Sequence, residues 1–265
     1  MNATQTQIKL GGMALEVVQL APSKDAYKHA PTIVFLHEGL GSVSMWRDFP
    51  ARLCATTGCA GLVYSRAGYG PSDSVPDVRN SGRLQPDYMH RQAWDVLPAL
   101  LDALHILHPI LLGHSDGASI ALLYASKFSA EGCIAMAPHL FVEDMTIKSI
   151  EAAQQTYLHT DMRNTLARFH QDVDCAFWQW NDVWLSVAFR NFNIEAECAQ
   201  ITCPVLAIQG YDDPYGSMAQ IDTLALSNMR RQLLKLEQCG HSPHKDHMQK
   251  VLQAVADWHG ALRAV

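Results

Sequence analysis

The amino-acid sequence predicts an α/β domain in which a mostly parallel central sheet carries helices on both faces. Three observations predict this fold class. Short apolar runs of strand length alternate with helix-like stretches, glycine-rich turns follow two of these runs, and one long helical stretch interrupts the alternation between residues 141 and 199. A strand pattern returns at residue 205. We therefore expect a core formed by residues 1–140 and 200–265, with a helical insertion at residues 141–199.

The predicted elements follow one another in a regular order. The chain starts with a hairpin, in which Gly11-Gly12 form the turn between Ile8–Leu10 and Met13–Val17. Apolar runs predict strands at Thr32–Leu36, Leu62–Tyr64, Ile110–Leu112, Cys133–Met136, Pro204–Gly210 and Gln232–Leu236. Helical patterns include Ala118–Tyr124, Ile147–Tyr157 and Asn164–Phe169, and a further helix is expected at the end of the chain.

The segment Gly113-His114-Ser115-Asp116-Gly117 matches the pattern G-x-S-x-G, with a predicted strand before it and a predicted helix after it. So tight a turn needs glycine where side chains would clash, and it holds its central residue in a strained conformation that exposes the side chain. The same letters occur by chance in loops, but the strand and helix around them favour a functional interpretation. The pattern therefore predicts Ser115 as a nucleophile.

A serine hydroxyl is a weak nucleophile at neutral pH, so this prediction requires a histidine base and an orienting acid, downstream in the order Ser, Asp/Glu, His. Asp212 and Asp213 directly follow the predicted strand that ends at Gly210, and either could be the acid. His241 lies on a glycine-containing loop between the last predicted strand and the last helix, and it is the expected base.

Two further histidines, His244 and His247, lie close to His241 in the sequence and raise the alternative of a metal cluster. No carboxylate or cysteine pattern completes a ligand set, and a Ser-His-Asp triad needs no metal. We therefore expect no metal and no other cofactor, and we expect His244 and His247 to be exposed at the start of the last helix.

A tetrahedral intermediate needs hydrogen-bond donors for its oxyanion, one from the residue after the nucleophile and one from a loop after an earlier strand. The N–H of Asp116 is the first expected donor. Upstream, the predicted strand Thr32–Leu36 leads into the glycine-rich turn His37-Glu38-Gly39-Leu40-Gly41. Gly39 is the expected second donor, with Leu40 as the alternative.

Together these features resemble the α/β-hydrolase superfamily over essentially the whole chain. Four marks of that family match in order: the turn His37–Gly41, the elbow at Ser115, the acid loop at Asp213 and the loop at His241. A fifth, residues 65–72, is similar to the Arg-x-x-Gly-x-Ser turn of many members. The resemblance implies an α/β-hydrolase fold with residues 141–199 as its cap. It also favours Asp213, because the acid of this fold usually lies a few residues past the strand, beside a following proline.

The sequence departs from the family at one point and resembles a subgroup at another. Most members have a plain His-Gly pair where this chain has His37-Glu38-Gly39, which leaves the donor amide open and adds a carboxylate near the site. The Ser-Asp-Gly letters of the elbow resemble a minority that includes amino-ester hydrolases similar to valacyclovir hydrolase.

The expected cap is rich in aromatic residues, among them Trp178, Trp180 and Trp184. Trp180 and Trp184 are four residues apart, a spacing that more often marks packing against the domain beneath than a ligand pocket. Pockets at this position are largely apolar, however, so we expect at least one of the three tryptophans to bind substrate.

Three polar side chains near the expected site each allow two interpretations. Asp116 either pairs with a cationic substrate group or lies at a helix start, where the helix dipole favours a carboxylate. Glu38 either faces substrate or anchors its own loop through Arg66 or Arg47. His139 follows a predicted central strand and is expected to face the interface with the cap; a contact with substrate stays open.

Composition restricts the remaining function classes. The chain has 265 residues, 48% hydrophobic content and a net charge of −6 with scattered basic residues, which argues against a nucleic-acid partner. The N-terminus lacks a signal-peptide pattern, and no apolar stretch approaches the ~18 residues of a membrane span, so we expect a cytoplasmic protein without membrane contact. Seven cysteines without C-x-x-C spacing are expected to be reduced and buried. The expected partner is a small-molecule substrate, and a homodimer stays open.

The sequence therefore predicts a serine hydrolase that cleaves a small to medium carboxylic ester through an acyl-enzyme. Alternatives within the enzyme class are an aminopeptidase similar to proline iminopeptidases, a lactonase and a carbon–carbon bond hydrolase. Epoxide hydrolases and dehalogenases are disfavoured, because those relatives use Asp where this chain has Ser115. A ligand-sensing receptor with a retained triad is the alternative from another class, since fold alone does not determine function.

Overall fold

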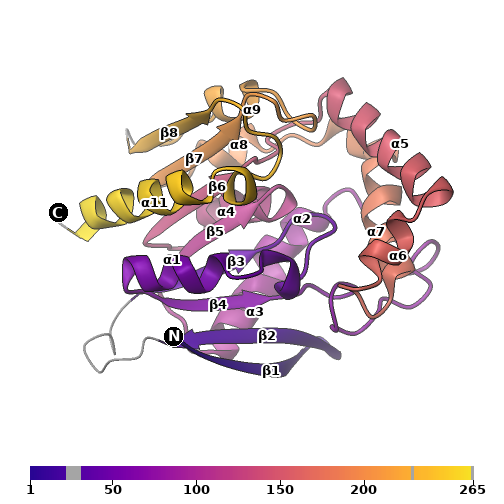
Figure 1. The fold of residues 1–265 in the computed structure, drawn as a ribbon, viewed down its shortest axis with the longest axis horizontal. Helices are drawn as coiled ribbons and strands as arrows, with labels where there is room; N and C mark the ends of the chain where they lie inside the picture. The colour runs from indigo at the N-terminus through magenta and orange to yellow at the C-terminus, as the bar shows by residue number, and fades with distance from the viewer. Residues whose placement is uncertain (22–30, 228–229, 264–265) are drawn as a thin grey trace.

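A computed structural model describes residues 1–21, 31–227 and 230–263, which build one eight-stranded sheet (Figure 1). The strands are β1 (Asn2–Leu10), β2 (Met13–Ala21), β3 (Thr32–Leu36), β4 (Ala60–Tyr64), β5 (Pro109–His114), β6 (Gly132–Met136), β7 (Val205–Gly210) and β8 (Arg231–Leu236). They lie in the order β1-β2-β4-β3-β5-β6-β7-β8. β2 is antiparallel to both of its neighbours, and all pairs from β4 to β8 are parallel. The predicted α/β class with a mostly parallel sheet is confirmed.

Helices cover both faces of the sheet (Figure 1). On one face, α1 (Phe49–Thr57) and α11 (Met248–Arg263) contact each other; on the other lie α3 (Leu97–Ala103) and α4 (Asp116–Lys127). Shorter helical segments are η2 (Val43–Trp46), α2 (Tyr88–Arg91), η3 (Gln92–Val96), α9 (Ala219–Asp222) and α10 (Pro243–Asp246).

The central strands are apolar on both faces, because each face packs against helices. In β3, Phe35 joins the core beneath α1 and α11, whereas Val34 and Leu36 join the core beneath α3 and α4. This alternation follows from the two-residue period of a strand. It explains why the central strands could be recognised in the sequence as continuous apolar runs.

The chain between β6 and β7 is helical, as the sequence predicted. It contains α5 (Asp144–His159), α6 (Met162–Leu166), α7 (Val173–Trp184), η4 (Ala188–Asn191) and α8 (Glu195–Cys198). The first three form a separate group at one end of the sheet (Figure 1). A β-bridge between Phe141 and Asn193 brings the two ends of the insertion together, and α8 packs against α4 of the core. The division of the chain into domains at residues 140 and 200 stays a prediction.

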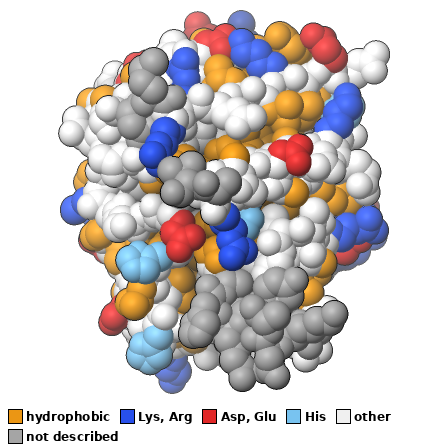
Figure 2. Space-filling model, turned by 90° about the vertical axis from the view of Figure 1, so that its left-hand side faces the viewer, with side chains coloured by type: hydrophobic (Ala, Val, Ile, Leu, Met, Phe, Trp, Pro, Cys, Tyr) orange, Lys and Arg blue, Asp and Glu red, His pale blue; other side chains and the backbone are white. Residues whose placement is uncertain are grey.

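The surface and the cysteines add two observations. Figure 2 views the molecule from the left-hand side of Figure 1, and on the described part of this face basic and acidic side chains are interspersed. All seven cysteines are buried. No helix within the described ranges is both long and apolar enough to span a membrane.

Candidate active site

Ser115 lies in the sharp turn between β5 and α4, with φ 54° and ψ −120°. A positive φ is strained for a residue with a side chain. The two glycines permit the turn, because a Cβ at Gly113 would overlap the carbonyl of Gly117, and a Cβ at Gly117 would overlap the carbonyl of Leu36. The Ser115 N–H donates to the Met136 carbonyl at 2.9 Å, which ties the turn to the neighbouring strand. Strand, turn and helix are therefore arranged as the G-x-S-x-G pattern predicted.

Asp213, and not Asp212, contacts His241. Both carboxylate oxygens of Asp213 lie close to His241 Nδ1, at 2.9 and 2.8 Å. The same carboxylate accepts hydrogen bonds from the Tyr215 N–H (2.8 Å) and from Gln209 Nε2 (2.9 Å), whereas Asp212 is exposed. Burial raises the pKa of Asp213, but the hydrogen bond and charge of His241 outweigh it and the pKa lies below its usual value. Asp213 is thus an ionised carboxylate that fixes the orientation of the His241 ring.

Ser115 and His241 line the same cavity, which also contains His139. The Ser115 Oγ hydrogen-bonds His139 Nε2 at 3.4 Å. Among the described residues, His241 is not a hydrogen-bond partner of the Ser115 hydroxyl. Contacts of a general base are often long before substrate binds and tighten in the complex. The arrangement therefore brings the three predicted triad residues close together without a closed Ser115–His241 hydrogen bond.

The hydrogen bonds of the Glu38 carbonyl fix the orientation of the Gly39 amide in the turn after β3. The Glu38 carbonyl accepts three hydrogen bonds, from His37 Nδ1 (2.7 Å), Arg66 Nη2 (3.0 Å) and the Gly41 N–H (3.0 Å). In a trans peptide the C=O and the following N–H point in opposite directions, so the Gly39 N–H faces away from these donors. Gly39 lines the cavity, and so does Leu40, the alternative donor.

The cavity has a volume of about 160 Å³. Its walls are formed by Glu38, Gly39, Leu40, Ser115, Asp116, His139, Ile150, Trp180, Trp184, Tyr215 and His241. Ile150 and Tyr215 were not singled out from the sequence. Tyr215 follows Asp213 by two residues on the acid loop, a position that could have indicated it.

A comparison with known protein families identifies the family of this chain. Residues 33–254 match the pattern of the family described as "Alpha/beta hydrolase family". The chain belongs to the α/β hydrolase family. No curated protein matches the chain in sequence.

Solved structures share this fold at low sequence identity. They include an enol-lactonase from Burkholderia xenovorans LB400 (TM-score 0.72, 18% identity, 96% of this chain and 99% of that one). A hydrolase from Pseudomonas aeruginosa PA01 is similar with a TM-score of 0.73, 19% identity and coverage of 97% and 98%. A proline iminopeptidase from Mycobacterium smegmatis has a TM-score of 0.71, 16% identity and coverage of 98% of both chains. At these identities the likeness supports the fold alone.

Two of the three candidate tryptophans of this α/β hydrolase reach the cavity. Trp180 and Trp184 line it, and the ring of Trp180 lies where a Cβ on Gly39 would be. Trp178 does not: its ring lies beneath the Arg79 guanidinium, 3.8 Å from it, in an outer groove. Two residues along a helix turn the side chain by about 200°, which places the candidate Trp178 outside the cavity that Trp180 and Trp184 line.

The Asp116 carboxylate is buried and already paired. Tyr88 Oη donates to one oxygen at 2.6 Å and Trp184 Nε1 to the other at 3.2 Å. Burial raises the pKa of Asp116, and the charge of Arg66 together with these hydrogen bonds opposes the rise. The side chain thus joins the core to α7, a contact that neither interpretation of the sequence included.

His139 is buried with its ring at the nucleophile. Its main chain is held by Ser119 Oγ, which accepts from the His139 N–H (2.9 Å) and donates to the His139 carbonyl (2.7 Å). The ring packs edge-on against Trp184, with centroids 4.9 Å apart, and its Nδ1 has no hydrogen-bond partner in the part of the chain that the structure describes. Burial, with the charge of His241, lowers the pKa of His139 to about 3, so its imidazole is neutral at neutral pH.

The Glu38 side chain has other partners than the two arginines considered from the sequence. Its carboxylate contacts His114 Nδ1 at 2.7 Å and Lys245 Nζ at 3.5 Å. Arg66 holds the same loop through the backbone carbonyls of His37 (2.6 Å) and Glu38. Glu38 therefore both lines the cavity and anchors its loop.

His244 is buried, contrary to the expectation of an exposed position. Its ring packs against Trp46 and Phe49, with centroids 4.9 and 5.4 Å away. Burial is the main reason that the pKa of His244 lies well below its usual value. Among the described residues, no group of three or more His, Cys, Asp and Glu side chains could hold a metal ion.

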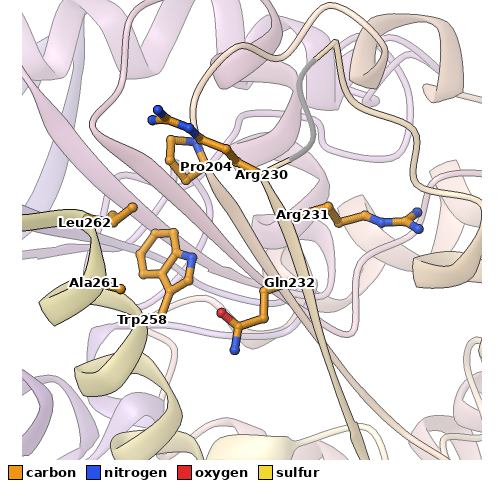
Figure 3. A pocket seen from close by; sticks show the side chains of 7 residues that line it. All are labelled: Pro204, Arg230, Arg231, Gln232, Trp258, Ala261 and Leu262. Atoms are coloured by element: carbon orange, nitrogen blue, oxygen red, sulfur yellow. The ribbon is translucent and has the colours of Figure 1, made fainter. Parts of the chain in front are cut away.

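A second pocket, of about 290 Å³, lies at the end of the sheet opposite Ser115, between α11 and the start of β8. Figure 3 shows Trp258, Ala261 and Leu262 on one side of it, with Arg231 pointing away from Trp258. Pro204 directly precedes β7 and Arg231 begins β8, so this pocket lies at the amino ends of the parallel strands. Ligands of open α/β sheets bind at the carboxyl ends, where Ser115 lies.

Proposed function

We propose that the protein is a serine hydrolase that cleaves carboxylic esters through an acyl-enzyme. The observation that carries this proposal is the paired Asp213–His241 contact, at 2.8 and 2.9 Å, beside a serine held in an elbow turn. An imidazole fixed through Nδ1 by a carboxylate presents Nε2 as a base, and a serine at the elbow is the group that such a base activates.

In the proposed mechanism, His241 Nε2 takes the proton of Ser115 as Oγ attacks the ester carbonyl. The amides of Gly39 and Asp116 stabilise the oxyanion, and Asp213 stabilises the imidazolium. The intermediate collapses, the C–O bond to the alcohol breaks, and His241 returns the proton to the leaving alkoxide. Water, activated by the same histidine, then attacks the acyl-enzyme and releases the acid.

The cavity supports a small, neutral acyl group. Its volume is about 160 Å³, and a cavity of about 150 Å³ holds one benzene molecule. Ile150, Trp180, Trp184 and Tyr215 supply apolar walls, and the charged lining residues are the acids Glu38 and Asp116. A long chain would extend beyond the cavity, and an anionic acyl group would meet two carboxylates. We therefore propose acyl groups of about the size of butanoyl or benzoyl.

The two acids also favour a second candidate, an ester that carries an ammonium group. A cation near Glu38 or Asp116 would be attracted by the carboxylate. Both side chains are already paired within the protein, Asp116 with Tyr88 and Trp184 and Glu38 with His114 and Lys245, which weakens this candidate. The neutral ester therefore remains the proposed substrate class.

A panel of p-nitrophenyl esters tests the proposal: acetate, butanoate, benzoate, decanoate and hemisuccinate. We expect multiple turnovers, with kcat/KM for butanoate and benzoate at least about tenfold above that for decanoate and hemisuccinate. A preference for decanoate would reject the size argument. Hydrolysis that stops after one turnover would favour the receptor alternative, and no hydrolysis of any ester would reject the proposed function.

A further inference from the structure

His114, the residue before the nucleophile, lies between two hydrogen-bond acceptors. Its Nδ1 is 2.7 Å from a carboxylate oxygen of Glu38, and its Nε2 is 2.6 Å from the backbone carbonyl of His241. The His114 side chain is 1% exposed, so water does not replace either partner. Both contacts are short for hydrogen bonds between nitrogen and oxygen.

These two partners decide which protons His114 carries. A carbonyl oxygen only accepts, and an ionised carboxylate only accepts, so both ring nitrogens must donate and the ring is an imidazolium. The alternative is a neutral ring that faces a protonated Glu38. Burial raises the pKa of Glu38, but the charge and hydrogen bond of His114, together with Lys245, hold it well below its usual range. The Lys245 ammonium, 3.5 Å from the other Glu38 oxygen, also favours the ionised carboxylate.

This pair connects the three loops that hold the candidate catalytic groups. Glu38 precedes the oxyanion residue Gly39 after β3, and His114 precedes Ser115 at the end of β5. The third loop, after β8, is joined through the carbonyl of His241 itself. The His114 ring thus links the turn after β3 (the oxyanion turn), the elbow and the His241 loop, and it reaches His241 through the backbone carbonyl, whereas Asp213 contacts the ring.

We propose that Glu38 and His114 form a buried ion pair that positions the candidate base His241 and the oxyanion turn relative to Ser115. Both are positioning residues, since they act through the backbone of their neighbours. The inference rests on the proposed function for its catalytic consequence, whereas the ion pair itself is a property of the folded protein. It also assigns a role to the glutamate that replaces the usual glycine after His37.

The charged and titratable groups around His114 come from three elements. Glu38 faces it from the turn after β3, and His241 faces it from the loop after β8, with ring centroids 5.1 Å apart. From α10, His244 packs against it at 4.8 Å, and Lys245 contacts the far oxygen of Glu38 at 3.5 Å. Burial and the neighbouring His114 charge lower the pKa of His244, so it stays neutral and adds no competing charge.

Three variants separate positioning from other roles of Glu38. In Glu38→Gln, the amide N–H can donate to Nδ1 while Nε2–H still donates to His241, so the link survives with a neutral His114. In Glu38→Ala, the oxyanion turn loses its side-chain contact with His114. Glu237→Gln is the matched control, because Glu237 is exposed on the loop that leads to His241.

The first measurement is a nitrogen-15 NMR spectrum of the histidine side chains of the whole protein. We expect both His114 nitrogens to carry protons in the wild type and in Glu237→Gln, and only one in Glu38→Gln. We also expect the His241 signals to shift in Glu38→Ala. A singly protonated His114 in the wild type would overturn the ion pair.

The second measurement is the steady-state kinetics of the same proteins on the best ester. Misplacement by about 1 Å can cost 10²-fold, so we expect kcat of Glu38→Ala to fall about 10- to 100-fold at similar KM, and Glu38→Gln to keep most of the activity. A raised KM at unchanged kcat would make Glu38 a substrate contact, and equal losses in both variants would make its charge essential; either result overturns the positioning role. If the wild type hydrolyses no ester, the proposed function fails and the NMR spectra still decide the ion pair.

Discussion

Replacing Asp213 by asparagine changes the protonation of His241 while leaving the shape of the site intact. Asp213 accepts from His241 Nδ1 through both oxygens, at 2.8 and 2.9 Å. An asparagine amide in this position can donate to Nδ1, which moves the ring proton to Nε2 and removes the acceptor for the serine proton. We expect kcat to fall by a factor on the order of 10³ to 10⁴, or about 4 to 5.5 kcal/mol of transition-state stabilisation.

The same substitution should lower stability, because every Asp213 oxygen has a donor beside it. One oxygen accepts from the Tyr215 N–H at 2.8 Å and the other from Gln209 Nε2 at 2.9 Å. Whichever way the asparagine amide turns, its NH₂ faces one of these donors, at a cost of about 1 to 3 kcal/mol. Urea unfolding measures this loss separately from kcat.

Asp212→Asn is the matched control, because Asp212 is the exposed neighbour on the same loop. We expect this variant to keep wild-type kcat and stability. A larger loss of kcat in Asp212→Asn than in Asp213→Asn would move the acid to Asp212. Retention of a tenth or more of the activity by Asp213→Asn would refute the role of the carboxylate.

Three further predictions follow from the site. Gly39→Ala should lower kcat by a factor on the order of 10², because the new Cβ would overlap Trp180. Gly260→Ala is the control: its Cβ meets open space, so kcat should stay unchanged. Equal kcat in the two variants would contradict the placement of Gly39. Asp116→Asn should lower kcat/KM for neutral and α-amino esters alike, because its carboxylate accepts from Tyr88 and Trp184, and a loss confined to α-amino esters would instead assign it to an ammonium group. The pKa of Asp213 is lower in the folded protein than its usual value, so the stability it contributes is complete above a pH of about 3.9 and is lost as pH falls through the folded pKa. Melting temperatures between pH 2 and pH 7 should show an acid-side loss that is smaller in Asp213→Asn, and an identical loss in both proteins would contradict this linkage.

The parts of the site that the sequence predicted are those encoded by short patterns. The elbow around Ser115 needs two glycines at fixed spacing, because a Cβ at either position would overlap a backbone carbonyl. The acid and base loops follow predicted strands, and the carboxyl ends of parallel strands meet at one edge of a sheet. Local rules therefore sufficed to bring Ser115 and His241 to one cavity, with Asp213 hydrogen-bonded to His241.

The parts that the sequence did not predict depend on contacts between distant segments. Trp178 and Trp180 lie on different sides of α7. The bounds of that helix were not known from the sequence, so the side that faces the core could not be predicted. His244 is buried because η2 and α1 supply the stacked rings of Trp46 and Phe49 against which it packs. The pairing of Glu38 with His114 joins residues 76 positions apart, for which no local pattern exists.

The central claim, an acyl-enzyme on Ser115, is tested most directly by trapping it. A p-nitrophenyl butanoate reaction quenched with acid within the first turnovers can be analysed by intact mass spectrometry and peptide mapping. We predict one butanoyl adduct, located on Ser115 in the wild type and absent in Ser115→Ala, which should keep its fold because the truncated hydroxyl opens no core cavity. An adduct on another residue, or hydrolysis at the wild-type rate by Ser115→Ala, would contradict the account.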